Sequence, residues 1–270
     1  TKTAGLTFFD RKAYTGLLRY AVIRATLIGE SLVTIVTSAP LPEAEEAVKT
    51  QLENLAKHLN CTSLIWAINH TNTDVSSGDE LRTISGPGFI KEKIRGNTYK
   101  ITPNSFFQTN SSAAGLLMDT VTSFAMTANP ELLLDLYCGS GFFSIPLAKK
   151  INKVIGIEIV PEAIQDAIEN AKNNNVSVDF RVAKTESADW KSIEADTIIL
   201  DPPRAGLHDK VIADIMIAMP KNIVYVSCNF KSFAREMVSL GPKYEVSQMV
   251  AIDMFPHTPH VELVSHLVRR

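Results

Sequence analysis

The chain has 270 residues, of which 45% are hydrophobic and 21% are charged, a composition ordinary for a globular protein of one or two domains. Its three cysteines form no C-x-x-C pair, which excludes a disulfide framework and a four-thiolate metal or cluster site and favours a reducing compartment. Because no apolar run reaches membrane-spanning length and the first residues show no signal-peptide pattern, we expect a cytoplasmic protein without membrane contact.

The first hundred residues combine short β-type runs with one helix. Residues 17–24 and 31–36 predict a hairpin, residues 42–59 an amphipathic helix that begins with proline and acids, and residues 63–69 a further strand. Residues 78–101 predict a polar loop and a glycine-rich hairpin. This order predicts a small α+β domain, which we place at residues 1–103.

Charge is distributed unevenly along the chain. The net charge of −2 does not by itself indicate a nucleic-acid binder, but the first hundred residues hold 12 basic and 10 acidic side chains. A cluster of Lys91, Lys93, Arg95 and Lys100 interleaves with Phe89, Ile90 and Tyr99, a pattern that suits either phosphate contact or a solvated hairpin face.

From Asn110 onward the pattern alternates between helix and strand. Helices are predicted at 111–124, 143–150 and 161–173, and strands at 132–136, 153–158, 178–182, 197–200 and 223–226. Residues 244–252 and 260–268 predict two more strands. Such alternation is typical of the α/β class, with a doubly wound, mostly parallel sheet, which we place at residues 104–270.

The clearest motif lies where the strand at 132–136 ends. Asp135 is followed by Gly139 and Gly141, which let the backbone approach a ligand closely, although a purely structural turn would read the same way. The next predicted strand ends at Glu158, where a carboxylate can accept hydrogen bonds from ribose hydroxyls. Because the turn has no basic residue for a diphosphate, S-adenosylmethionine fits better than a dinucleotide.

Three further segments concentrate reactive side chains. Asp201-Pro-Pro-Arg204 follows a buried strand, and its prolines stiffen a turn that either presents Asp201 to a polar ligand or lets it cap the loop. Ser227-Cys228-Asn229 places a thiol before a predicted helix, where its pKa can be lowered, although a lone cysteine is more often a packing residue. The segment from Asp253 to Glu262 gathers acids, histidines and an aromatic, but His257 and His260 lack metal-ligand spacing, so we expect no metal.

Taken in order, these motifs resemble one known family. Ser105-Phe-Phe-Gln108-Thr-Asn110, Asp135 to Gly141, Asp201 to Arg204, Ser227-Cys-Asn229 and Asp253 to Glu262 are similar to motifs of the RNA uracil-5-methyltransferases, which make 5-methyluridine in transfer and ribosomal RNA. The resemblance covers nearly the whole chain. It implies a Rossmann-like catalytic domain that uses S-adenosylmethionine, preceded by a small domain that helps to grip RNA.

The resemblance also assigns roles to individual residues. It makes Cys228 the nucleophile and Glu262 the general base, and it places Gln108, Tyr137, Glu158 and Asp201 at the cofactor or target base. Adding a thiolate to carbon 6 of uracil activates carbon 5, and a base must then remove the carbon-5 proton. Asp201 and Arg204 would form hydrogen bonds with the edge of the uracil or stabilise the charge that develops on it. The uridine would be flipped out of an RNA loop.

The chain also departs from the family pattern. Phe230 stands where proline often follows Ser-Cys-Asn, and Phe142 lies near a position that is Asn in some relatives. The sequence shows neither the upstream oligonucleotide-binding domain that many members carry nor the four-cysteine iron-sulfur cluster of some members, and it leaves open whether an upstream domain belongs to the protein. We expect no metal cluster, and we expect a monomer. The alternatives are a methyltransferase of another base or of protein glutamine or asparagine, and a non-catalytic RNA-binding module that keeps the cofactor fold. We expect Phe106, Phe107 and Cys138 to be packing residues.

Overall fold

The computed structural model describes residues 6–270 and divides into two compact units. The first unit comprises residues up to Lys93 together with Lys100–Ser105, and the second comprises Ile94–Tyr99 and Phe106–Arg270. The expected signal-free start falls partly on residues 1–5, which lie outside the described residues. Within residues 6–270, no helix combines the length and apolar character that a membrane span needs.

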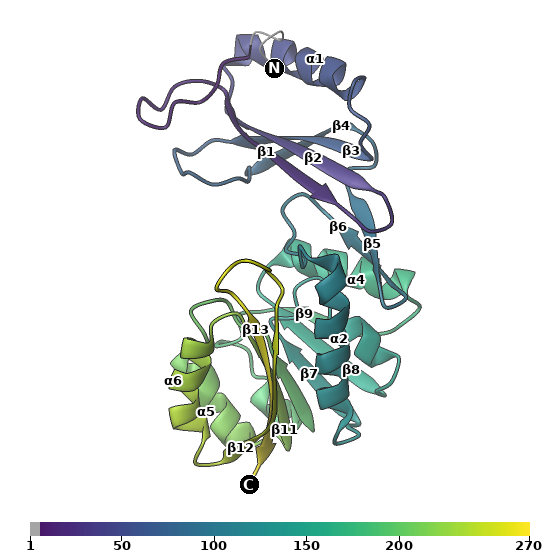
Figure 1. The fold of residues 1–270 in the computed structure, drawn as a ribbon, viewed down its shortest axis with the longest axis vertical. Helices are drawn as coiled ribbons and strands as arrows, with labels where there is room; N and C mark the ends of the chain where they lie inside the picture. Colours follow the sequence, from purple (N-terminus) through teal and green to yellow (C-terminus); the bar gives the residue numbers. More distant parts are fainter. Residues whose placement is uncertain (1–5) are drawn as a thin grey trace. The chain divides into compact units, whose positions relative to one another are not determined.

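The first unit is a four-stranded sheet with one helix (Figure 1). Its strands follow the order β1-β2-β3-β4, with β2 and β3 parallel and the outer pairs antiparallel. Helix α1 connects the two parallel strands, as a parallel pair requires. The elements are β1 (Leu18–Ala25), β2 (Ser31–Ser38), α1 (Pro42–Ala56), β3 (Ser63–Asn69) and β4 (Glu80–Ser85). The predicted hairpin, helix and third strand are therefore confirmed.

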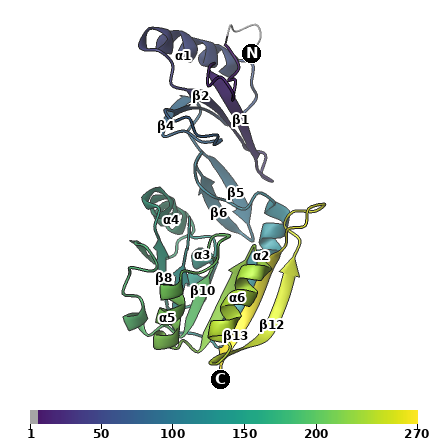
Figure 2. The ribbon, with the colours of Figure 1, turned by 90° about the vertical axis from the view of Figure 1, so that its left-hand side faces the viewer.

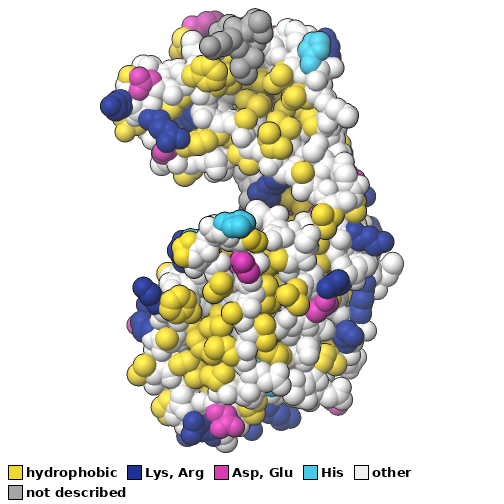
Figure 3. Space-filling model, viewed as in Figure 1, with side chains coloured by type: hydrophobic (Ala, Val, Ile, Leu, Met, Phe, Trp, Pro, Cys, Tyr) yellow, Lys and Arg dark blue, Asp and Glu magenta, His cyan; other side chains and the backbone are white. Residues whose placement is uncertain are grey.

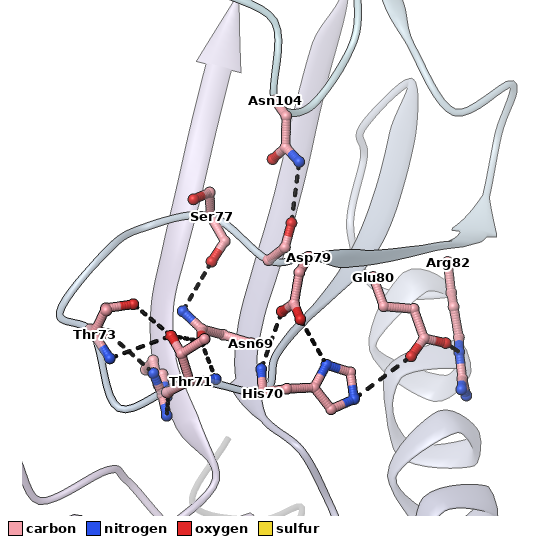
Figure 4. Close-up of polar contacts among 11 residues, drawn as sticks. Asn69, His70, Thr71, Thr73, Ser77, Asp79, Glu80, Arg82 and Asn104 are labelled. Carbon is pink, nitrogen blue, oxygen red and sulfur yellow. Dashed lines mark hydrogen bonds and ion pairs between the residues drawn. The ribbon is translucent and has the colours of Figure 1, made fainter. Parts of the chain in front are cut away.

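The connection between β3 and β4 is fixed by polar contacts (Figure 4). The Asp79 carboxylate accepts hydrogen bonds from the His70 backbone at 3.0 Å and lies 3.0 Å from His70 Nδ1. The side-chain amides of Asn69 and Asn104 donate to the carbonyl groups of Ser77 and Gly78. These side chains thus provide hydrogen-bond partners for backbone groups of a loop that has no secondary structure to pair them.

A hairpin of β5 (Ile90–Ile94) and β6 (Asn97–Ile101) follows. Its turn residues Arg95 and Gly96 have φ values of 49° and 78°, the positive pair that a tight hairpin turn requires. The hairpin tip packs with the second unit, because Tyr99 Oη donates to the Phe142 carbonyl at 3.0 Å and the Thr98 amide donates to Asn174 Oδ1 at 2.9 Å. Assigning residues 94–99 to the first domain is therefore a point on which the sequence-based boundary differs from the packing. The division into a small domain at residues 1–103 and a catalytic domain at residues 104–270 stays a prediction.

The second unit is built on a seven-stranded sheet of order β12-β13-β11-β10-β7-β8-β9. Strands β7 to β11 are parallel, whereas β13 runs antiparallel to both β11 and β12. The predicted doubly wound, mostly parallel sheet is confirmed. Its strands are β7 (Leu132–Leu136), β8 (Lys153–Glu158), β9 (Asp179–Val182), β10 (Thr197–Leu200), β11 (Asn222–Ser227), β12 (Tyr244–Ile252) and β13 (Glu262–Arg269).

Helices cover both faces of this sheet. Helices α5 and α6 lie together on one face (Figure 2), and α2 lies on the other, against β11 and β13. The remaining helices, α3 and α4, pack against β8. The bounds are α2 (Ser111–Met126), α3 (Ser144–Ala148), α4 (Pro161–Asn173), α5 (Asp209–Ala218) and α6 (Phe230–Leu240), with a short 3-10 helix at Lys191–Ile193.

Besides the short 3-10 helix, strand β4 and helix α5 were not predicted from the sequence. Strand β4 exposes Leu81 and alternates weakly, so its pairing with β3 decides its conformation. Helix α5 has Val211 and Ile215 buried one turn apart and His208 as its N-cap, a helical spacing that was available in the sequence. Strand β4 completes the sheet of the first unit. Helix α5 completes, with α6, the helical layer on one face of the large sheet.

Candidate active site

The site lies where the strand order of the large sheet reverses. Strand β7 has β8 on one side and β10 on the other, and ligands of open α/β sheets bind outside the carboxyl ends of strands at such a switch point. Asp135 lies near the end of β7, and Asp201 directly follows β10. The two predicted acids therefore flank the switch point.

The glycine turn after β7 keeps one side open. Tyr137 has a φ of 69° and Gly139 a φ of 52°, and the Tyr137 and Cys138 amides donate to the Ile157 carbonyl of β8. A Cβ placed on Gly139 would meet no atom of the described residues within 4 Å, whereas one on Gly141 would meet Phe180 at 3.0 Å. Gly141 is thus needed for packing, and Gly139 leaves space in which a ligand can approach the backbone.

Asp135 is the most deeply buried acid of the site. Its side chain is 0% exposed, and Oδ2 accepts a hydrogen bond from the Ser144 hydroxyl at 2.5 Å. Burial raises the pKa of Asp135 to about 7, and Oδ1 has no hydrogen-bond partner among residues 6–270. A buried polar atom without a partner is unfavourable, so this oxygen is positioned to accept a bond from a ligand.

Glu158 connects the turn to the start of α4. Its Oε2 accepts from the Gly139 amide at 3.2 Å, and its Oε1 accepts from the amides of Ile159 and Val160 at 2.8 and 3.0 Å. These bonds fix the carboxylate at the end of β8, about twenty residues after the turn begins. A carboxylate has further lone pairs in the plane, so bonds to a ligand's hydroxyl groups remain available.

Cys228 and Glu262 are brought together by the antiparallel pairing of β11 and β13. Ser227 lies opposite Leu263 in the register. Because the two strands are antiparallel, the residue after Ser227 faces the residue before Leu263, which places Cys228 beside Glu262. Cys228 is partly buried, and Glu262 is 7% exposed. Burial raises the pKa of Glu262 to about 7, which suits a general base or acid near neutral pH.

The thiol does not show the lowered pKa that its position before a helix suggested. Burial raises the pKa of Cys228, and the charges of Glu262 and Asp201 raise it further, whereas Arg204 lowers it. The expectation from the helix N-terminus was therefore wrong for the free protein, because burial and two nearby acids outweigh it. The same interactions show that Cys228, Glu262, Asp201 and Arg204 lie in one electrostatic neighbourhood.

The acids of the two strand-end clusters also interact. Burial raises the pKa of Asp201, and the charges of Glu262, Asp135 and Glu158 act in the same direction. The candidate cofactor residues and the candidate catalytic residues therefore lie within electrostatic range of one another. Such a concentration of acids with raised pKa values is characteristic of functional sites.

The turn that carries Cys228 is fixed without a proline. Asn229 caps α6 by accepting from the Lys231 amide, and the Ser227 hydroxyl donates to the Asn229 carbonyl at 2.9 Å. Phe230, which stands at the usual proline position, is 55% exposed. Side-chain hydrogen bonds thus give the turn its rigidity, and the aromatic ring faces solvent.

The segment before α2 contributes Gln108, which is partly buried. Asn110 caps α2 by accepting from the Ala113 amide and donates to the Met254 carbonyl at 3.2 Å, which links this segment to the loop before Glu262. Phe107 packs 5.6 Å from Tyr99, ring centroid to centroid. Phe106 is 77% exposed, so the expectation that both rings belong to the core is wrong for Phe106, whereas Phe107 and Cys138 are buried as expected.

Comparison with known families agrees with this arrangement. The model of the tRNA (Uracil-5-)-methyltransferase family matches residues 21–189 and 179–270, which include every strand-end residue described above. The chain belongs to this family. The resemblance inferred from the motifs is therefore confirmed.

Individual proteins named as RNA methyltransferases are similar to this chain along nearly its whole length. A tRNA (uracil(54)-C(5))-methyltransferase from Pyrococcus horikoshii is 41% identical over 265 residues, covering 97% of this chain and 61% of the relative. An RNA methyltransferase of Caldanaerobacter subterraneus subsp. tengcongensis, named as uncharacterized, is 39% identical, with 97% and 59% covered. The crystal structure of Pyrococcus abyssi tRNA (uracil-54, C5)-methyltransferase in complex with S-adenosyl-L-homocysteine superposes with a TM-score of 0.85 at 39% identity, covering 99% of this chain and 64% of that one. The chain thus spans about 60% of the length of these relatives.

Some residues of the site escaped the sequence analysis of this family member. No role was assigned to Ser144 from the sequence, yet its hydroxyl donates to Asp135 Oδ2. Asn229 carried a visible N-cap signal. Glu236 carried no local signal, because its partners Tyr225 and Leu207 lie 11 and 29 residues away.

Proposed function

We propose that this chain carries the catalytic activity of an S-adenosylmethionine-dependent RNA methyltransferase that methylates carbon 5 of a uridine. The observation that carries the proposal is the pairing of Cys228 with Glu262 beside Asp201 at the carboxyl edge of the sheet. The names of the relatives favour tRNA over rRNA as the substrate. We further propose that the protein acts as a monomer in the cytoplasm.

The residues around the glycine turn fit S-adenosylmethionine. Asp135 Oδ1 is buried and has no partner in the described part of the chain, so it suits the cofactor's ammonium group. The open side of Gly139 allows close approach to the backbone. Glu158 would accept bonds from the ribose hydroxyls, and Gln108 and Tyr137 would line the site. When bound, the cofactor supplies an electrophilic methyl group.

The protein's own residues would carry the remaining chemistry. The Cys228 thiolate adds to carbon 6 of uracil and gives carbon 5 the character of an enolate, which takes up the methyl group. The Glu262 carboxylate then removes the carbon-5 proton, the double bond re-forms and the thiolate leaves. Because the pKa of Cys228 is raised in the free protein, we expect the thiolate to form only when RNA is bound.

Asp201 and Arg204 would orient the uracil. Asp201, whose pKa is raised by burial, can donate or accept a hydrogen bond at the base edge, and Arg204 can stabilise negative charge on the carbonyl oxygens of the uracil. Carbon 5 and carbon 6 are hidden in a stacked helix, so the uridine would be flipped out of its loop.

The proposal is tested by separating the two catalytic residues. Without the thiol no adduct forms, so Cys228→Ala should abolish both methylated product and covalent complex. Without the carboxylate, addition and methyl transfer can proceed but elimination stalls, so Glu262→Gln should accumulate a protein-RNA species that carries the labelled methyl group. Labelled cofactor, a tRNA or rRNA transcript and a denaturing gel suffice.

Matched variants and the opposite outcomes complete the test. Cys61→Ala changes a partly buried thiol in the first unit and should methylate RNA normally. If Cys228→Ala still methylates RNA, the covalent route is wrong. If the wild type binds S-adenosylhomocysteine and RNA but transfers no methyl group, the non-catalytic module is the better description, and labelling of protein or of another base would favour the other alternative.

A further inference from the structure

A buried carboxylate lies behind the active-site loops and plays no part in the proposed chemistry. Glu236 is on α6 and is 1% exposed. Its Oε1 accepts from the Leu207 amide and from Arg235 Nη2, both at 3.0 Å, and its Oε2 accepts from the Tyr225 hydroxyl at 2.5 Å. Leu207 lies at the end of the loop that starts with Asp201.

The same helix holds this loop at several other points. The Asn229 side-chain amide and the Ser232 hydroxyl donate to the Arg204 carbonyl at 3.1 and 3.3 Å. Arg235 Nη2 also donates to the Ala205 carbonyl at 2.9 Å. One face of α6 therefore binds the backbone of residues 204, 205 and 207, while the residue just before its N-cap is Cys228.

The loop is shaped to receive the Glu236 carboxylate. Gly206 has a φ of 91°, and a Cβ at this position would lie 2.0 Å from Glu236 Oε1. Only glycine permits this backbone conformation and this approach. The fit between Gly206 and Glu236 sets the distance between the loop and α6.

From these contacts we propose that Glu236 is a positioning residue, which holds the Asp201–Arg204 loop in register with Cys228 through the backbone of Gly206 and Leu207. The inference rests on the proposed function in that it names what the held loop and thiol do. Two loops from different strands, those after β10 and β11, must act on one uracil ring. A single helix that binds the first and begins at the second keeps their separation fixed.

The proposal predicts a defect in catalysis that exceeds the loss of stability. Misplacing a reacting group by about 1 Å can lower a rate on the order of 100-fold. We therefore expect Glu236→Ala to lower kcat for RNA methylation by about 10- to 100-fold, with the KM for S-adenosylmethionine changed less than about twofold. Glu236→Gln keeps an oxygen that can accept from the Leu207 amide, so it should recover most of the rate.

A buried carboxylate elsewhere in the second unit provides the control. Asp214 on α5 is 4% exposed and forms ion pairs with Lys191 and Lys210 at 3.3 and 3.1 Å, and neither lysine belongs to the loop. Asp214→Ala should lower the melting temperature without lowering kcat at temperatures where the variant is folded. A role for Glu236 in stability alone would make the two alanine variants behave alike.

A second measurement needs no RNA and no methyl transfer. Burial and the charges of Glu262 and Asp201 raise the pKa of Cys228, so a released loop should admit water, move Asp201 away and make the thiol more reactive. In full-length protein carrying Cys61→Ser, we expect iodoacetamide to alkylate Cys228 at pH 7.5 at least about threefold faster in Glu236→Ala than in wild type. Mass spectrometry of the Cys228 peptide measures the rate of alkylation. Glu236→Gln and Asp214→Ala should be alkylated at the wild-type rate.

The two readouts separate this inference from the proposed function. If the wild type transfers no methyl group but Glu236→Ala alone shifts the alkylation profile, the proposed function fails and the positioning role stands. If methylation proceeds but Glu236→Ala matches the wild type in kcat and alkylation, or if it behaves like Asp214→Ala in both, the positioning role is wrong. If Glu236→Ala does not fold, Gly206→Ala tests the same contact, because its Cβ would lie 2.0 Å from Glu236 Oε1 and force the loop away from the carboxylate. An unchanged kcat and an unchanged alkylation rate of Cys228 in Gly206→Ala would then overturn the proposal.

Discussion

At the scale of single residues, the four acids of the candidate site differ in their surroundings. They are Asp135, Glu158, Asp201 and Glu262. Glu158 accepts three backbone hydrogen bonds at the end of β8. Asp135 and Glu262 are buried, and burial raises the pKa of each to about 7. A carboxylate that backbone hydrogen bonds hold in place suits hydroxyl recognition, whereas one that titrates near neutrality suits proton transfer.

Glu158 gives the first residue-level prediction. Glu158→Ala removes the proposed ribose contacts and the acceptor for the Gly139 amide, so it should weaken binding of S-adenosylhomocysteine by about 1–3 kcal/mol. Calorimetric titration measures the affinity. Glu162→Ala, which removes an exposed acid in the first turn of α4, is the matched control and should leave the affinity unchanged. An equal affinity for Glu158→Ala would mean that the cofactor is held in another way.

At the scale of elements, the β5–β6 hairpin shows how one segment can carry different tasks on its two faces. Ile90 and Ile94 point into the protein, while Lys91 and Lys93 are exposed on the other face of β5. Arg95, which the sequence grouped with these lysines, forms an ion pair with Asp119 of α2 at 2.7 Å. Figure 3 shows basic side chains spread over the visible face among acidic ones. For RNA binding, we therefore expect a local cluster such as that on β5 to matter more than the net charge of the chain.

The hairpin gives an element-level prediction about RNA. Replacing Lys91 and Lys93 together by Ala should weaken RNA binding and lower the slope of log affinity against log salt by about 2, because two phosphate contacts are lost. Arg95→Ala should have a smaller effect, since its charge is already paired. Filter binding at several salt concentrations measures both quantities.

Two exposed lysines after α3 provide the control for this experiment. Lys149→Ala with Lys150→Ala removes the same charge from the second unit. If this pair changes the salt slope as much as Lys91 and Lys93 do, the effect reflects overall charge, and an unaltered slope in both would place the RNA surface elsewhere.

At the scale of the whole molecule, the buried acids make stability depend on pH. Glu262 has a pKa of about 7 in the folded protein against an ordinary value of 4.5, so the folded state binds more protons than the unfolded state between these values. Its contribution to stability is therefore fully present below about pH 4.5 and is lost as pH rises through about 7. Above pH 7 the folded protein must keep an ionised carboxylate in a buried position.

This sign leads to a global measurement. Glu262→Gln removes the titrating group, so the free energy of unfolding of Glu262→Gln relative to wild type should rise by about 1 kcal/mol between pH 6 and pH 8. Urea unfolding of the free protein at both pH values gives the difference, and the comparison cancels other titrating groups such as His266. Glu245→Gln, at an exposed position of β12, should show no such change. A relative free energy that falls with pH would contradict the buried, protonated state of Glu262.

The sequence by itself determined the elements and the motifs, because periodicity and turn chemistry are local. Alternation of strand and helix predicted the parallel sheet, and five motifs in order identified the family and named Asp135, Glu158, Asp201, Cys228 and Glu262. Helix α5 also had a readable spacing. The signals of strand β4 were too weak, and its partner β3 decided its conformation.

Only the tertiary structure decided how these residues act on one another. Cys228 and Glu262 are separated along the chain, and the antiparallel register of β11 and β13 places them side by side. The raised pKa of Cys228, the ion pair of Arg95, the exposure of Phe106 and the bonds of Glu236 likewise depend on distant segments. Burial and electrostatic interactions arise from whatever packs nearby, and that neighbourhood is set by the whole fold rather than by the local sequence.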